Sequence, residues 1–173
     1  MGGQRQQSVE LILAARALNW PAAASPISQF MISVLRLSKR AMETTATTCD
    51  AHGLSYAEFE VLAALRSAPA PHELIPTVLS SGVLISSGGL TKVLATLEAK
   101  GLIARGAGEA DRRSKPARLT HEGRQRAERV MQELIRSDET LISRRLSPAE
   151  VDRATRLLRK LLLSFEQTEG AGG

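Results

Sequence analysis

At 173 residues the chain is long enough for one domain with helical extensions, and its 43% hydrophobic but only 3% aromatic content favours helices built on Leu, Ala, Val and Ile. The net charge of +5 favours a polyanionic partner. One cysteine excludes an internal disulfide, and the absence of an apolar run of roughly 18 residues and of a secretory signal predicts a cytoplasmic protein that does not enter a membrane.

Two helices are predicted in the first third of the chain. Apolar residues recur at helical spacing in residues 4–19, and the stretch 21–26 has the Pro and Ala composition of a linker. A longer apolar stripe, from Ile27 to about Cys49, predicts a second helix that stops at the turn 50–53.

The middle of the chain predicts a helix-turn-helix. Ser55 and Glu58 form a capping box for a helix that ends before Pro69. A short helix begins at Pro76, and Ser86 is the expected N-cap of the next one, for which Gly101 occupies the position just past the C-terminus.

The last third predicts a small hairpin and two helices. Strand-like runs flank a basic turn within residues 102–120, Thr120 caps a long helix, and Ser147 and Glu150 form a second capping box before a strongly amphipathic helix. The expected fold is therefore mainly α with a small β-hairpin wing: a winged helix-turn-helix domain with N- and C-terminal dimerisation helices. The expected segments are 1–26 (extension helix and linker), 27–53 (dimerisation helix), 54–122 (winged helix-turn-helix) and 123–173 (C-terminal dimerisation helices).

The second helix of the predicted pair opens with small and polar residues. Such residues permit close approach to DNA, helix N-terminal N–H groups can meet phosphate, and Ser, Thr and Lys can reach base edges. An ordinary helix N-terminus has a similar composition, so this segment is ambiguous when taken alone. The residues concerned are Ser86, Ser87, Gly88, Gly89, Thr91 and Lys92.

The hairpin tip makes DNA binding the better interpretation. Residues 105–126 contain seven Lys or Arg against three acidic residues, a surplus of four that accounts for most of the net charge. Arginine is favoured by the negative potential of a narrow minor groove, although a solvated basic loop is the alternative interpretation. A helix followed by a basic hairpin is how a winged helix-turn-helix meets DNA. The tip residues predicted to bind DNA are Asp111, Arg112, Arg113, Ser114 and Lys115.

From about Ile27 to Phe165 the sequence resembles the MarR family of transcriptional regulators. The similarity is carried by LSYAEFEVLAAL, LISSGGLTKVLATLEAKGLI and, most specifically, DRRSKPARLTHEG at residues 111–123. The resemblance implies an obligate homodimer whose first and last helices form the interface. It also implies that Arg113 enters the minor groove braced by Asp111, while the start of the second helix lies at the major groove.

Within this family the extra N-terminal helix and GLSYAEFEVLAALRSAPAP resemble the PecS-like, urate-responsive branch. That branch carries a Trp in the added helix and an acidic residue after the L-S-x-x-E-F start. The implied ligand-binding counterparts are Trp20 and Glu60, and the family implies a small aromatic or phenolic effector. Trp20 departs from the pattern in lying next to Pro21, and Glu60 in being Glu rather than Asp.

Other reactive residues point to structural roles. A peroxide-sensing Cys49 would need basic or tyrosine partners to lower its pKa, and a half-buried structural cysteine is the favoured interpretation. The three histidines lack metal-ligand spacing, and no nucleotide loop or nucleophile–base pair is recognisable. We therefore expect no metal, no cofactor and no enzymatic activity.

The sequence thus predicts a dimeric transcriptional regulator that binds pseudo-palindromic double-stranded DNA as a repressor under the control of a small organic ligand. The alternative is a winged-helix module that binds another protein without sequence-specific DNA binding. Salt dependence separates the two, since phosphate contacts make affinity fall steeply with salt concentration.

Overall fold

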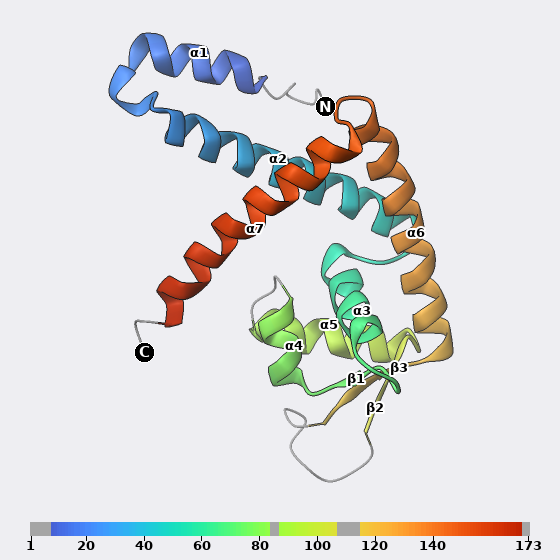
Figure 1. The fold of residues 1–173 in the computed structure, drawn as a ribbon. Coiled ribbons are helices and arrows are strands. Elements are labelled where there is room, and N and C mark those ends of the chain that lie inside the picture. Colours follow the sequence, from blue (N-terminus) through green and yellow to red (C-terminus); the bar gives the residue numbers. More distant parts are fainter. Residues whose placement is uncertain (1–7, 84–86, 107–114, 171–173) are drawn as a thin grey trace, which may run out of the picture. The chain divides into compact units, whose positions relative to one another are not determined.

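A computed structural model describes residues 8–83, 87–106 and 115–170. The chain forms two compact units, the first ending at Ala127 and the second beginning at Glu128, and each is described here by itself. Figure 1 shows the order of the elements along the chain.

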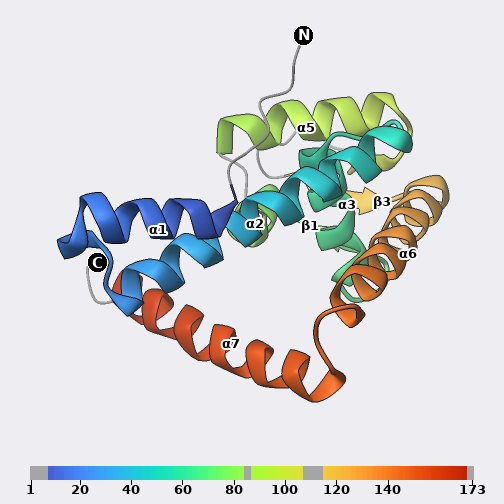
Figure 2. The same ribbon diagram turned by 90° about the horizontal axis from the view of Figure 1, so that it is seen from above.

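The first unit begins with two helices joined by a short turn. α1 (Val9–Asn19) is capped by the Ser8 hydroxyl, and α2 (Pro26–Ala51) by the Ser25 hydroxyl. The segment predicted as a linker contains the 3-10 turn η1 (Pro21–Ala23). α1 lies alongside the N-terminal part of α2 in both views (Figures 1 and 2), so the chain reverses direction at this turn.

Three shorter helices follow: α3 (Tyr56–Ser67), α4 (Pro76–Gly82) and α5 (Ser87–Ala99). The capping box predicted for α3 is confirmed, because the Glu58 amide donates to the Ser55 hydroxyl and the Ser55 amide donates to the Glu58 carboxylate. α4 and α5 pack on α3 and on each other. This arrangement is the predicted helix-turn-helix, while the predicted N-cap Ser86 lies outside the described residues.

The wing contains one more strand than the sequence predicted. β2 (Ile103–Arg105) and β3 (Ala117–Leu119) form the expected antiparallel hairpin, and β1 (Glu73–Leu74) adds to the free edge of β3, giving the order β1-β3-β2. β1 has only two residues and follows the turn at Pro71 and His72, so it has no alternating pattern from which a strand could be recognised.

The core of the first unit is aliphatic, as the composition predicted. It brings together side chains from α3, α4, α5 and the strands, and Cys49 from the end of α2 is completely buried rather than half-buried. The largest fully buried side chains are Leu54, Val61, Leu62, Leu65, Leu79, Leu97 and Leu102.

Thr120 connects the wing to α6 (His121–Ser143) and caps it as predicted. The Thr120 hydroxyl accepts a hydrogen bond from the Gly123 amide at 3.0 Å, and it lies 2.8 Å from the Gly101 carbonyl oxygen, to which it donates. Gly123 is buried directly against the Leu102 carbonyl, where a side chain would not fit.

The second unit contains the rest of α6 and the final helix, α7 (Pro148–Gly170). The predicted capping box is present, with the Ser147 amide 2.8 Å from the Glu150 carboxylate to which it donates. Large apolar side chains of α7 are exposed in the single chain, Leu157 and Leu162 each by more than half of their surface. The predicted apolar stripe of α7 therefore leaves much of its surface uncovered within one chain.

Candidate nucleic-acid interface

The helix α5 presents two different faces. Leu90, Leu94 and Leu97 recur at helical spacing and are buried, which attaches the helix to the core. The opposite face is exposed at Gly88, Thr91 and Lys92. A Cβ atom on Gly88 would meet nothing within 4 Å, so this part of the helix surface is open to a partner.

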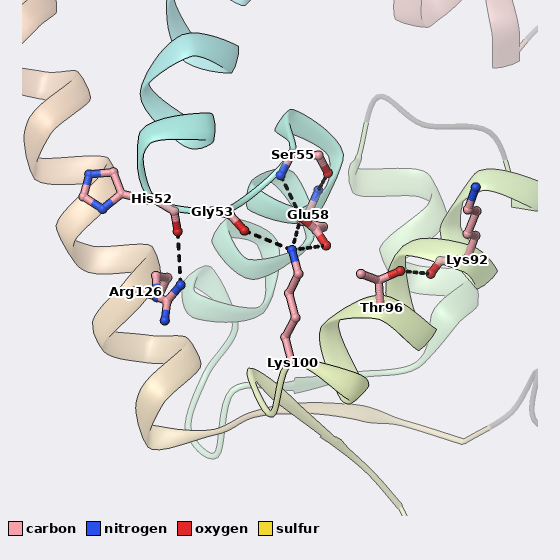
Figure 3. A network of polar contacts seen from close by, with 8 residues as sticks. All are labelled: His52, Gly53, Ser55, Glu58, Lys92, Thr96, Lys100 and Arg126. Carbon is pink, nitrogen blue, oxygen red and sulfur yellow. Dashed lines mark hydrogen bonds and ion pairs between the residues drawn. The ribbon is translucent and has the colours of Figure 1, made fainter.

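The predicted helix residues do not all share that open face. Gly88, Thr91 and Lys92 are brought together on it, whereas Gly89 is half-buried. Ser87 is the first residue of α5. Figure 3 shows the Lys92 side chain extending from the middle of α5, eight residues before Lys100. The exposed part of the predicted site thus contains a cation, a hydroxyl and a position without a side chain.

The wing is described at its base and not at its tip. Asp111, Arg112, Arg113 and Ser114 lie outside the described residues, so the structure does not test the roles assigned to them. Lys115 is half-buried next to Pro116, whose carbonyl accepts a hydrogen bond from the Gly106 amide at 3.1 Å.

Arg118 is an exposed basic residue that the sequence reasoning did not include among the DNA-binding residues. It lies at the centre of β3, between the buried Ala117 and Leu119, and faces Glu73 and Ala104 on the neighbouring strands. The period-two alternation of residues 117–119 was the signal that could have placed it on the solvent face of the wing.

A polar network joins the end of α5 to the start of α3 (Figure 3). The Lys100 ammonium, immediately after α5, lies 2.8 and 2.9 Å from the two carboxylate oxygens of Glu58. It also donates to the Gly53 carbonyl at 3.0 Å. These contacts involve residues more than 40 positions apart, and the sequence reasoning found none of them.

Glu58 is buried and yet charged. Burial acts to raise the pKa of its carboxyl group, but hydrogen bonds from the Lys100 ammonium and the Ser55 amide, together with the positive charge of Lys100, outweigh burial and lower the pKa below its ordinary value. Glu58 therefore remains ionised at neutral pH inside the first unit.

A second cation holds the same turn from another helix. Arg126, near the start of α6, donates to the His52 carbonyl at 3.1 Å and pairs with Glu122 at 2.9 Å. Gly53 ends α2 in the left-handed conformation, with φ of 68°. The two carbonyls that directly follow α2, those of His52 and Gly53, thus each meet a cation, at the helix end where the dipole favours positive charge.

The implied ligand-binding residues lie in different surroundings. Trp20 ends α1 and is exposed over 63% of its surface. Glu60 is half-buried on α3 and accepts a hydrogen bond from the Tyr56 hydroxyl. Trp20 and Glu60, both within the described part of the chain, share no hydrogen bond. Burial, followed by the charges of Asp50 and Glu60, raises the pKa of the Cys49 thiol to about 11, which opposes formation of the reactive thiolate.

Neither a metal site nor a membrane span is found where the structure describes the chain. Residues 8–83, 87–106 and 115–170 contain no group of three or more His, Cys, Asp or Glu side chains able to hold a metal ion. None of the described helices is both long and apolar enough to cross a membrane.

Part of the sequence is similar to known transcriptional regulators. Residues 52–114 match the model of the MarR family. The HTH-type transcriptional regulator PecS of Dickeya dadantii (strain 3937) is 36% identical over 90 residues, which is 52% of this chain and 54% of that protein. The chain thus spans about half the length of this curated relative.

Solved structures show the same fold. AbsC, a MarR family transcriptional regulator from Streptomyces coelicolor, has a TM-score of 0.69 at 18% identity, covering 83% of this chain and 97% of its own. Sco3205, a MarR family regulator from the same organism solved in complex with DNA, has a TM-score of 0.65 at 19% identity, covering 94% of this chain and 91% of its own. The predicted winged helix-turn-helix fold is therefore confirmed, and the sequence match over residues 52–114 agrees with the resemblance to the MarR family.

Proposed function

We propose that this chain is a transcriptional regulator of the MarR family that binds double-stranded DNA as a homodimer, since its residues 52–114 match that family's model. The observation that carries the proposal is the exposed face of α5. Gly88, Thr91 and Lys92 offer DNA a close approach, a hydroxyl and a positive charge on a helix whose other face is anchored in the core.

In the proposed complex α5 reads the major groove and the basic wing reaches the backbone and the minor groove. Arg113 is the proposed minor-groove residue, with Asp111 bracing it and Arg112, Ser114 and Lys115 beside it in the chain. Arg118, exposed on the stem of the wing, adds a positive charge to the same hairpin. Binding is therefore expected to depend steeply on salt.

The homodimer is proposed because so much apolar surface remains uncovered in one chain. Ile27, Leu35 and Leu37 on α2 are each exposed by more than 60%, and Leu157, Leu162 and Phe165 on α7 by more than 50%. Many large apolar side chains exposed on two helices favour an interface with another chain. Two copies related by a two-fold axis would present two copies of α5 to the half-sites of a pseudo-palindrome, as expected of a repressor at an operator.

We further propose that a small aromatic or phenolic ligand modulates binding through Trp20 and Glu60. Such a ligand would act by binding one spacing of the two DNA-binding lobes more tightly than another. Because Trp20 is the only tryptophan, its fluorescence reports directly on an aromatic ligand. Saturable quenching by urate or salicylate, reduced by Glu60→Gln, is the expected result, and quenching that does not saturate would remove these residues from the ligand site.

The DNA-binding proposal is tested by selecting duplexes from a random pool with the purified protein at two salt concentrations. The expected product is a pseudo-palindrome whose recovery falls as salt rises. The wild-type protein is then compared with Arg113→Ala, which should lose at least about 1 kcal/mol of binding free energy for the selected duplex. Unchanged affinity of that variant would remove the wing tip from the interface.

The alternative proposal is a winged-helix module that binds another protein. It is favoured if the folded protein recovers no enriched sequence at either salt concentration. Contacts to a protein through the apolar helices would also show a much weaker dependence on salt than contacts to phosphates.

A further inference from the structure

The C-terminal end of α5 is held at one point by three oxygen atoms. An ammonium group has three N–H donors. The Lys100 ammonium has three acceptors within hydrogen-bonding distance: both Glu58 carboxylate oxygens at 2.8 and 2.9 Å, and the Gly53 carbonyl at 3.0 Å. Its three N–H donors therefore all have acceptors within the protein, as Figure 3 shows, while 36% of the side chain remains exposed.

The acceptors are themselves fixed in place. Glu58 is buried and its carboxylate also accepts from the Ser55 amide at 2.7 Å, so the same side chain caps α3 and receives Lys100. The turn that carries the Gly53 carbonyl is held on its other side by Arg126, which donates to His52. Lys100 thus contacts a rigid part of the fold rather than a free side chain.

The ion pair is better suited than the apolar core to fix the position and tilt of α5 relative to α3. Leu90, Leu94 and Leu97 attach the helix to the core, but burial of apolar surface is non-directional. Hydrogen bonds to an ion require both distance and direction. The ion pair is therefore suited to set how far α5 slides along α3 and how it tilts.

The distance along α5 amplifies a small change at the anchored end. The helix rises about 1.5 Å per residue, so Gly88 lies about 18 Å along the axis from Lys100. A tilt of about 5° at Lys100 would displace the Gly88 end by about 1.6 Å, whereas hydrogen bonds to base edges tolerate a range of only about 0.5 Å.

From this geometry we infer that Lys100 and Glu58 are positioning residues for sequence readout by α5: they set where Gly88, Thr91 and Lys92 meet the base edges without contacting DNA. The inference rests on the proposed function. The two lysines therefore have different expected roles. Lys92 is exposed on the open face of α5, where it can contact DNA, whereas the Lys100 ammonium is engaged with Glu58.

The test compares three full-length proteins: the wild type, the double variant Glu58→Gln with Lys100→Met, and Lys92→Met as the matched control. The double variant removes both charges together, so that neither is left buried without its partner. Circular dichroism and a thermal melt first establish that each protein is folded at the assay temperature. Dissociation constants are then measured for the duplex selected by the wild type and for a scrambled duplex, over a series of salt concentrations.

The double variant is expected to bind the selected duplex at least tenfold more weakly and the scrambled duplex within twofold of the wild type, with an unchanged salt slope. Lost stability alone would weaken binding to both duplexes by the same factor. Lys92→Met is expected to lower the slope of log K against log salt by up to about 0.9, because it removes a charge at the interface.

Two results would overturn the inference: a folded double variant that keeps the wild-type ratio of the two affinities, or one whose salt slope falls as that of Lys92→Met does. If the double variant does not fold, Glu58→Gln alone is used, since its amide oxygen can still accept from Ser55. It should reduce the same ratio, and an unchanged ratio contradicts the inference. Equal affinity of the wild type for both duplexes would instead count against the proposed function.

Discussion

Replacement of Gly123 by alanine tests the packing that joins the wing to α6. Alanine normally stabilises a helix by up to about 1 kcal/mol relative to glycine. At this position, however, an added Cβ would lie 2.8 Å from the carbonyl carbon and 3.2 Å from the Cα of Leu102, and closer still to the carbonyl oxygen. All of these atoms belong to the backbone, which cannot rotate away as a flexible side chain can.

The magnitude follows from what must move. The Leu102 carbonyl accepts from the Thr120 amide at 3.1 Å and from the Thr120 hydroxyl at 3.0 Å, so displacing it weakens two hydrogen bonds of about 1 kcal/mol each. Overpacking adds about 1–3 kcal/mol. After subtracting the gain in helix propensity, we expect Gly123→Ala to lower the free energy of unfolding by about 2–4 kcal/mol.

Urea unfolding followed by far-ultraviolet circular dichroism measures this difference, with all proteins at one protomer concentration because the stability of the proposed dimer would depend on it. The matched control is Gly82→Ala at the end of α4, where an added Cβ meets nothing within 4 Å. The control should be as stable as the wild type or more stable by up to about 1 kcal/mol. If Gly123→Ala is also as stable as the wild type, the reasoning from backbone contact is wrong.

Four further outcomes are expected. Thr120→Val should cost about 1–2 kcal/mol of unfolding free energy in urea and Thr120→Ser much less, because only the hydroxyl caps α6; equal losses would assign the effect to the methyl group. Cys49, with a pKa of about 11, should react with a thiol reagent at pH 8 only after unfolding, and rapid labelling of the native protein would contradict its burial. Because the pKa of Glu58 is lowered in the folded state, its contribution to stability should be complete above the carboxyl group's ordinary pKa and be lost as pH falls through the folded-state value. The difference in urea stability between the wild type and Glu58→Gln should therefore shrink on acidification, and a difference that is constant with pH would exclude this role. Leu158→Glu on α7 should dissociate or unfold the proposed dimer in analytical ultracentrifugation, whereas a variant that remains a folded dimer would show that this side chain does not face the partner.

The elements that the sequence predicted well depend on interactions between residues close together in the chain. The capping boxes at Ser55 and Ser147 each join residues three positions apart, and both are present. Gly101 ends α5 with φ of 68°, a conformation that favours glycine whatever surrounds it. The buried face of α5 followed in the same way from helical periodicity, whereas the structure separated the exposed Gly88, Thr91 and Lys92 from the half-buried Gly89.

The features that the sequence did not reveal depend on contacts between distant segments. β1 is a strand only because β3 offers it a free edge, and two residues carry no periodic signal of their own. Lys100 follows the end of a helix, where the helix dipole alone accounts for a lysine. Nothing in the sequence therefore indicated that it pairs with Glu58, 42 residues away. Gly123, the last residue of the segment DRRSKPARLTHEG, is required because the Leu102 backbone approaches it too closely for a side chain.

By itself, then, the sequence determined the helices, their ends, the aliphatic core and the polar face of α5, because propensity, capping and periodicity act over a few neighbouring residues. The tertiary structure decided the third strand, the close packing at Gly123 and the anchoring of α5 by Lys100 and Glu58. Each of these features depends on which backbone and charged groups meet when segments far apart in the chain pack together. Such polar contacts contribute more to stability when they are buried, because an unpaired buried polar group is costly.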